Sequence, residues 1–144
     1  MFIVGAGPGI GASAARRFAR GGYRVGLIAR DRVRLAALVD ELRAQGGDAA
    51  AVAADITQSS HLRAAIAELT QQLGEPDVLL FSALPDVSLI KPVLDTSAED
   101  LAAASALTIG GAATAVDAVA PAMRRRAAGT LLFTTGSGAL SPSA

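Results

Sequence analysis

The sequence has no cysteine and no tryptophan, and it holds one tyrosine, one histidine and one lysine. Without cysteine, disulfides, thiolate metal sites and a cysteine nucleophile are excluded. The single histidine, His61, has too few partners for a histidine metal site or a Ser-His-Asp triad, so we expect no bound metal. Aromatic residues make up 3% of the chain and hydrophobic residues 51%, so the core has to be built from Ala, Val, Leu and Ile.

The chain also lacks net charge, since 13 basic residues balance 13 acidic ones over 144 residues. No bulk positive field is present to attract nucleic acid or an acidic membrane. The uncharged stretch over 101–116 is shorter than the roughly 20 residues of a membrane span. The first residues resemble no signal peptide. We therefore expect one cytoplasmic domain with neither nucleic acid nor membrane as a partner.

Short apolar runs alternate with amphipathic stretches along the whole chain. The amphipathic stretches carry helix caps at their starts and glycines at their ends. Five strands separated by four helices predict an α/β fold, a doubly wound parallel sheet with helices on both faces. The strands are expected over 2–4, 23–29, 49–54, 77–82 and 129–134. The helices are expected over 10–21, from Asp31 to Gly46, from Asp55 to Gly74, and from a Thr96–Glu99 capping box to about Arg126.

Ligands of such sheets bind at the carboxyl ends of the strands, near the switch point beside the first strand. That rule brings four segments of this sequence around one crevice. They are the turn over 4–11, Ala29-Arg30, Asp55 and the segment Ser82–Leu84.

The turn reads Gly5-Ala6-Gly7-Pro8-Gly9-Ile10-Gly11 and lies between the first strand and the first helix. Glycine permits positive φ and lets a phosphate approach the backbone closely, and the free amides of the following helix favour negative charge. The turn therefore predicts a nucleotide-like cofactor; the alternative is a tight turn with a structural role only.

Three cofactor classes use turns of this kind. A flavin or ordinary NAD turn places glycine at the sixth position, where this chain has Ile10. A methyltransferase turn is usually followed by an acidic residue at the end of the second strand, which here reads Ala29-Arg30. Half of an S-adenosylmethionine-dependent methyltransferase remains an alternative.

The spacing Gly5-x-x-x-Gly9-x-Gly11 resembles the short-chain dehydrogenase/reductase family, as do Asp55-Ile56-Thr57 and the segments 77–80, 121–123 and 129–133. The resemblance implies a Rossmann-like sheet of strand order 3-2-1-4-5. It also implies NADP rather than NAD, because Arg30 stands where NAD-preferring members carry Asp; alternatively, Arg30 is a plain surface residue. Cofactor contacts are implied for Gly5, Gly7, Pro8, Gly9, Ile10, Gly11, Arg30, Asp55, Ile56, Ser82 and Ala83.

The catalytic positions of the family are poorly matched. Its active-site Asn falls on Thr108, and Ser137 is the nearest counterpart of its catalytic Ser. The family's Tyr-x-x-x-Lys pair, which exchanges a proton with the substrate oxygen, is absent, because Tyr23 and Lys91 are the only residues of their types. The family's reaction is hydride transfer between nicotinamide and a small carbonyl or alcohol. We expect this chain to bind the cofactor without catalysing that reaction.

The chain is also shorter than the family pattern. Residues 1–144 are expected to form a single NAD(P)-binding domain that is C-terminally truncated and lacks the last two strands of the family. The strand over 129–134 would then have an open edge, and the helix face with Ala104, Thr108, Ala112 and Ala115 would lose its packing. A non-catalytic nucleotide-binding sensor or interaction module is the alternative from another class. Homo-oligomerisation stays open.

Overall fold

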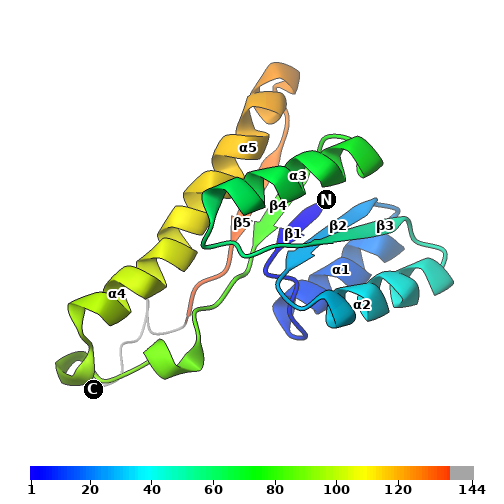
Figure 1. Cartoon of the computed structure of the whole chain (residues 1–144). Coiled ribbons are helices and arrows are strands. Elements are labelled where there is room, and N and C mark those ends of the chain that lie inside the picture. The colour runs from blue at the N-terminus through cyan, green and yellow to red at the C-terminus, as the bar shows by residue number, and fades with distance from the viewer. Residues whose placement is uncertain (137–144) are drawn as a thin grey trace.

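Five parallel strands form one sheet in the order β3-β2-β1-β4-β5 in the computed structural model, which describes residues 1–136 (Figure 1). This is the predicted Rossmann-like order, with β1 at the centre between β2 and β4. The strands are β1 (Phe2–Val4), β2 (Val25–Ala29), β3 (Ala49–Ala53), β4 (Val78–Phe81) and β5 (Thr130–Phe133). The helices are α1 (Ile10–Arg20), α2 (Arg32–Ala44), α3 (Ser59–Leu73), α4 (Ala98–Ser105) and α5 (Gly111–Arg126), with a π-helical turn over Ala106–Gly110.

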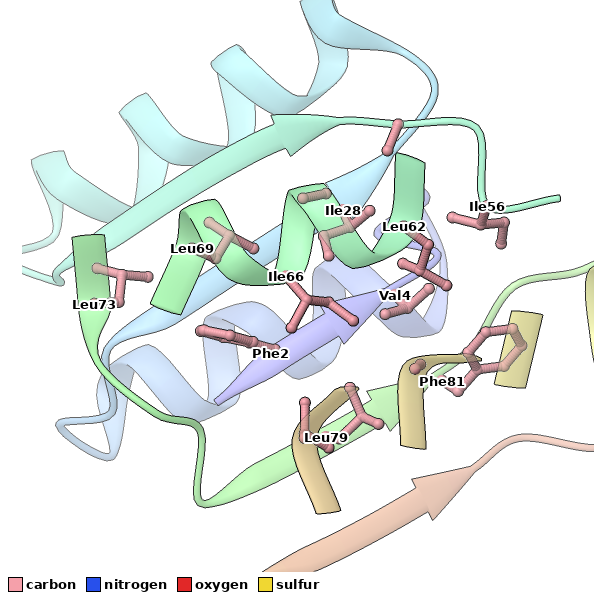
Figure 2. Close-up of a cluster of buried hydrophobic side chains, with 14 of the residues drawn as sticks. Phe2, Val4, Ile28, Ile56, Leu62, Ile66, Leu69, Leu73, Leu79 and Phe81 are labelled. Atoms are coloured by element: carbon pink, nitrogen blue, oxygen red, sulfur yellow. The ribbon is translucent and has the colours of Figure 1, made fainter. Parts of the chain in front are cut away.

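Two separate cores lie on the two faces of the sheet, because successive side chains of a strand point to opposite faces. In β1, Phe2 and Val4 face the core beneath α3 and α5, whereas Ile3 faces the core beneath α1 and α2. Figure 2 shows the first of these cores, where the leucines of α3 pack onto β1 and β4. Few aromatic side chains take part, and Ala, Val, Leu and Ile make up most of both cores, as predicted.

Two helix starts differ from the predicted ones. Asp31 does cap α2, since its carboxylate accepts a hydrogen bond from the amide of Arg34. The capping box of α4, however, is made by Ser97 and Asp100 instead of Thr96 and Glu99. The hydroxyl of Thr96 donates instead to the carbonyl oxygen of Pro92. Likewise α3 begins at Ser59 rather than at Asp55, whose carboxylate closes a local turn before the helix.

The long helix predicted after residue 96 is continuous through two glycines. The stretch Ala98–Arg126 runs from α4 through the π-helical turn into α5, and it forms the long diagonal rod in Figure 1. A Cβ atom at Gly111 would lie 3.2 Å from the ring of Phe81, so glycine lets the helix approach β4 closely. Within residues 1–136 this stretch alone is long and apolar enough to cross a membrane by length and composition. Its buried Ala115 and Val119 belong to the core of the sheet.

Strand β5 forms an edge of the sheet, as predicted, and among the described residues it pairs with β4 alone. All four of its residues are exposed, including the large side chains Leu131, Leu132 and Phe133. The predicted loss of packing on the helix is wrong at Ala115, which is fully buried. The reason is that Ala115 lies in the core where α5 packs against α3 and β4.

Truncation of a core leucine tests this arrangement. Leu79 of β4 is fully buried beneath α3 and α5, so Leu79→Ala should lower the free energy of unfolding by about 2–5 kcal/mol through lost burial and the cavity left behind. Urea unfolding followed by circular dichroism at 222 nm measures the change. The matched control is Leu94→Ala, since Leu94 is 95% exposed and its truncation should change stability by less than about 0.5 kcal/mol. Equal effects of the two substitutions would contradict the two-core packing.

Candidate functional site

A crevice of about 650 Å³ lies at the carboxyl ends of the strands. It is lined by all the residues that the sequence predicts as cofactor contacts, from Gly5 at the end of β1 to Ala83 at the end of β4. The structure therefore brings these residues together, while their contact with a cofactor stays a prediction. The lining also includes Ala6, Ala29, Asp31, Arg34, Leu84, Leu107, Thr134, Thr135 and Gly136.

Two glycines of the first turn are required by the packing of the chain itself. Gly5 has a φ of 88°, and a Cβ atom there would lie 2.4 Å from the backbone nitrogen of Ala83. A Cβ atom at Gly11 would lie 2.7 Å from the carbonyl oxygen of Gly5. The amides of Gly5 and Ala6 both donate to the carbonyl oxygen of Ile28, at 2.9 and 3.1 Å. The turn is thus held between the ends of β2 and β4.

The other two glycines, Gly7 and Gly9, lie beside space that no other atom of the chain fills. A Cβ atom at Gly9 would meet no atom within 4 Å, and one at Gly7 would come only within 4.0 Å of the carbonyl oxygen of Gly5. Both glycines line the crevice. Glycine at these two positions therefore keeps open a place where a ligand can approach the backbone.

The start of α1 presents unused hydrogen-bond donors to this space. Among the described residues, the amides of Gly9, Ile10 and Gly11 have no acceptor, whereas the amide of Ala12 already donates to Gly7. The first turn of α1 contains no acidic residue, and no side chain caps the helix. Unpaired amides together with the positive end of a helix dipole form a site that suits an anion such as a phosphate group.

Two arginines lie beside the end of β2. Arg30 has no side-chain hydrogen bond or ion pair among the described residues, and its guanidinium is free at the crevice. Arg34, one turn into α2, pairs through Nε with the carboxylate of Asp31 at 3.0 Å. Together they place positive charge on the part of the crevice formed by β2 and α2.

Asp55 follows β3 and is fixed by Thr57. Its Oδ1 accepts hydrogen bonds from the hydroxyl and the amide of Thr57, at 2.8 and 3.0 Å. The Thr57 hydroxyl, then its amide, and to a lesser degree the charge of Arg30 hold the pKa of the Asp55 carboxyl below its usual range. Within residues 1–136, the other carboxylate oxygen, Oδ2, has no hydrogen-bond partner, so it can accept a hydrogen bond from a ligand.

The residues predicted at catalytic positions are placed less favourably. Thr108 lies in the π-helical turn, is absent from the lining, and donates its hydroxyl to the carbonyl oxygen of Ala104 at 2.7 Å. Ser137 lies outside the described residues. Tyr23 lines a different hollow, at the amino ends of the strands. Lys91 pairs with Asp100 at 2.8 Å.

Sequence reasoning missed Arg34, Leu107, Thr134 and Thr135. The two threonines follow β5, so the rule about the carboxyl ends of strands could have found them. Arg34 could have been found from its place three residues after the cap Asp31. No sequence signal marks Leu107, which reaches the crevice through the π-helical turn.

The Asp55 turn gives a prediction for pH dependence. Thr57→Ala removes one of the two donors to Asp55, so the pKa of Asp55 should rise toward its ordinary value. A carboxylate whose folded pKa is lowered adds stability above its ordinary pKa, and that stability is lost as the pH falls through the lowered value. The variant should therefore lose less stability on acidification.

Titration of the Asp carboxyl carbons by NMR measures the shift. The control is Thr96→Ala, because the hydroxyl of Thr96 bonds Pro92 and does not touch Asp55. An unchanged Asp55 titration in Thr57→Ala would show that the hydroxyl does not set this pKa.

Comparison with known proteins gives a consistent picture. A family model described as short chain dehydrogenase matches residues 1–144. An A-factor type gamma-butyrolactone 1′-reductase (1S-forming) of Streptomyces virginiae is 48% identical over 75 residues, covering 52% of this chain and 29% of the relative. A 7α-hydroxysteroid dehydrogenase complexed with NADH and 7-oxo glycochenodeoxycholic acid is 31% identical with a TM-score of 0.86, covering 96% of this chain and 54% of that chain.

A further solved structure is an alcohol dehydrogenase of the archaeon Thermococcus sibiricus complexed with 5-hydroxy-NADP. It is 25% identical with a TM-score of 0.82, covering 94% of this chain and 57% of that chain. The chain thus spans little more than half the length of these solved structures. The region they share is the sheet and helices described above.

Proposed function

Because this chain belongs to the short-chain dehydrogenase family, as the match over residues 1–144 shows, we propose that it binds a nicotinamide dinucleotide in the crevice. One observation carries the proposal: the unpaired amides of Gly9, Ile10 and Gly11 face the space kept open beside Gly7. A pyrophosphate would accept hydrogen bonds from these amides at the positive end of α1. Once bound, the nicotinamide supplies a hydride donor or acceptor for a carbonyl or an alcohol.

We further propose a preference for NADP(H) over NAD(H). The free guanidinium of Arg30 supports it, since a planar fork of donors suits a phosphate group. Arg34 adds a second positive charge on the same side, offset in part by its partner Asp31. The two solved structures carry NADH in one case and 5-hydroxy-NADP in the other, so the preference rests on the arginines of this chain.

Asp55 and Ile56 would receive the adenine. Both line the crevice at the end of β3. The glycine turn follows β1, Arg30 follows the neighbouring strand β2, and β3 is the next strand outward. The free Oδ2 of Asp55 can accept a hydrogen bond from the exocyclic amine of adenine, and the side chain of Ile56 gives an apolar contact for the base. Thr57 fixes the carboxylate for that role.

The 144-residue chain is proposed to bind the cofactor without hydride transfer, as a nucleotide-binding module. The positions of the single Tyr and the single Lys support the absence of hydride transfer. Tyr23 lies at the opposite end of the strands from the crevice, and Lys91 is engaged with Asp100. A protein of the full length of its relatives is proposed to act on a carbonyl or an alcohol, in line with the reductase and dehydrogenase names of those relatives.

Arg30→Ala tests the cofactor preference. In the parent chain NADP+ should bind more tightly than NAD+, and the substitution should remove about 1.5–3 kcal/mol of binding to NADP+ while leaving NAD+ unchanged, because only the 2′-phosphate meets Arg30. Isothermal titration calorimetry with both nucleotides at one fixed salt concentration gives the affinities. Arg32→Ala is the matched control, since Arg32 is a neighbouring arginine outside the lining. Equal affinities of the parent for both nucleotides would reject the preference.

Gly9→Ala tests the proposed place of the pyrophosphate. The added methyl group meets nothing in the chain but enters the open space, so affinity for NADP+ should fall at least about tenfold. Loss of glycine at the helix N-cap should cost the fold only about 1 kcal/mol. Calorimetry gives the affinity and urea unfolding the stability.

The matched control for this substitution is Gly110→Ala, because a Cβ atom there comes no closer than 3.9 Å to another atom and lies outside the crevice. It should bind NADP+ like the parent. Unchanged affinity of Gly9→Ala would place the phosphates elsewhere.

A further inference from the structure

The outer edge of β5 carries backbone groups that can pair with a further strand. The amides of Thr130 and Thr134 donate to carbonyl oxygens on the β4 side. Because the backbone groups of successive strand residues point to opposite sides, Leu131 and Phe133 direct their N–H and C=O groups to the outer edge. Within residues 1–136 no strand pairs with that edge.

The side chains of β5 are apolar and partly exposed. Leu131, Leu132 and Phe133 are 37%, 39% and 53% exposed. Leu131 and Phe133 lie on the face of the sheet that α5 covers, and Leu132 lies on the opposite face. Residues 127–136 hold no charged side chain. An edge strand of this kind is a template for pairing with another chain.

The opposite edge of the sheet, β3, has the protection that β5 lacks. The side chain of Arg43 donates through Nε to the carbonyl oxygen of Ala49 at 3.0 Å. Ala49 and Ala50 are buried, and β3 has no side chain larger than that of Val52. A charged side chain laid along an edge blocks the approach of another strand. Of the two edges, β5 is therefore the one open to association.

We propose that β5 pairs with β5 of a second copy of this chain, antiparallel about a two-fold axis perpendicular to the sheet. Two sheets of five strands then join into one of ten. Such an axis keeps each face of the sheet on its own side, so residues of one face meet only residues of the same face. With the axis at Leu132, this residue stands opposite its own counterpart, and Leu131 stands opposite Phe133 of the second copy.

This register satisfies the backbone as well as the side chains. Leu131 and Phe133 both direct their backbone groups outward, so each pair of the two exchanges both N–H···O bonds across the axis. Leu132 turns its backbone groups to β4, and it therefore forms the non-hydrogen-bonded pair on the axis. An axis at Leu131 would place Phe133 opposite Gly129 and lose the apolar pair. The edge is thus complementary to itself, which favours a second copy over a different partner.

Helix α5 leaves room for the second copy. A Cβ atom at Gly111 would lie 3.2 Å from the ring of Phe81, so α5 lies over β4 rather than over the outer edge. Strands roughly 4.8 Å apart would separate the two β4 strands, and the α5 helices above them, by roughly 14 Å. Helices in direct contact lie about 8–10 Å apart, so side chains fit between these two. A groove of about 650 Å³ beside α5 is lined by Phe133, Val116 and Ala120 among others, and it receives those side chains.

A single introduced cysteine tests the register. The chain has no cysteine, so Leu132→Cys supplies its only thiol. Opposite residues of a non-hydrogen-bonded antiparallel pair have Cα atoms about 4.5 Å apart, which a disulfide can bridge. We expect oxidation with glutathione disulfide to convert most of this variant into a covalent dimer on a non-reducing gel.

Two matched variants control for random collision. Leu131→Cys lies two residues out of register with its counterpart, beyond the reach of a disulfide of roughly 7 Å between Cα atoms. Leu94→Cys is on a side chain that is 95% exposed and far from β5 in sequence. Both should stay mostly monomeric. Cross-linking of either as fast as Leu132→Cys would overturn the proposal.

Sedimentation equilibrium of the 144-residue chain gives an independent readout. The parent should be a dimer at micromolar concentration. Leu131→Pro removes an N–H that points outward and takes no part in the β4 ladder, so it should weaken the dimer at least about tenfold, while circular dichroism shows an intact fold. Leu94→Ala should dimerise like the parent.

A parent that sediments as a monomer at these concentrations would overturn the proposal and leave the edge to a different strand. A dimer that withstands Leu131→Pro would place the interface elsewhere and overturn it as well. Neither measurement involves a nucleotide, so the result is independent of the proposed function.

Discussion

The close approach of Gly5 to the backbone at the end of β4 is the contact on which the rest of the structure depends. A Cβ atom at Gly5 would collide with the backbone of Ala83. Because glycine has no Cβ atom, β1 and β4 can end side by side and then separate. The hydroxyl of Ser82 closes this contact on the carbonyl oxygen of Gly5, and Ile28 of β2 holds the turn from the other side. Three neighbouring strands thus fix where α1 begins, and with it the direction of its free amides.

This contact also gives the side chain of Ser82 a structural role. Its hydroxyl donates to the carbonyl oxygen of Gly5 at 3.0 Å. Thr108 differs, because its hydroxyl turns back onto Ala104 within the helix. The hydroxyl of Ser82 therefore holds two strand ends together, while that of Thr108 stays within its helix and away from the crevice.

The strands and most of the crevice could be predicted from the sequence for a physical reason, whereas the strand order follows from the resemblance to the family. Buried parallel strands are continuous apolar runs, and glycines such as Gly5 and Gly11 are fixed by close packing, so both leave local signals. The exact helix starts do not, because Thr96 and Ser97 are equally good caps, and the choice between them depends on Pro92, whose carbonyl engages Thr96. Leu107 joins the site only through the three-dimensional course of the π-helical turn, which no local pattern encodes.

The ionisable residues of the crevice all follow β2 and β3, which are covered by helices. β2 and β3 are paired to each other over five residues and covered by α2 and α3, so the groups that follow them are held firmly. β3 and β5 each pair with one neighbour among the described residues, but Ala49 and Ala50 of β3 are buried whereas the side chains of β5 are exposed. Segments with few buried contacts open more readily than core strands. Thr134 and Thr135 therefore follow an exposed edge strand, whereas Arg30 and Asp55 follow strands covered by helices.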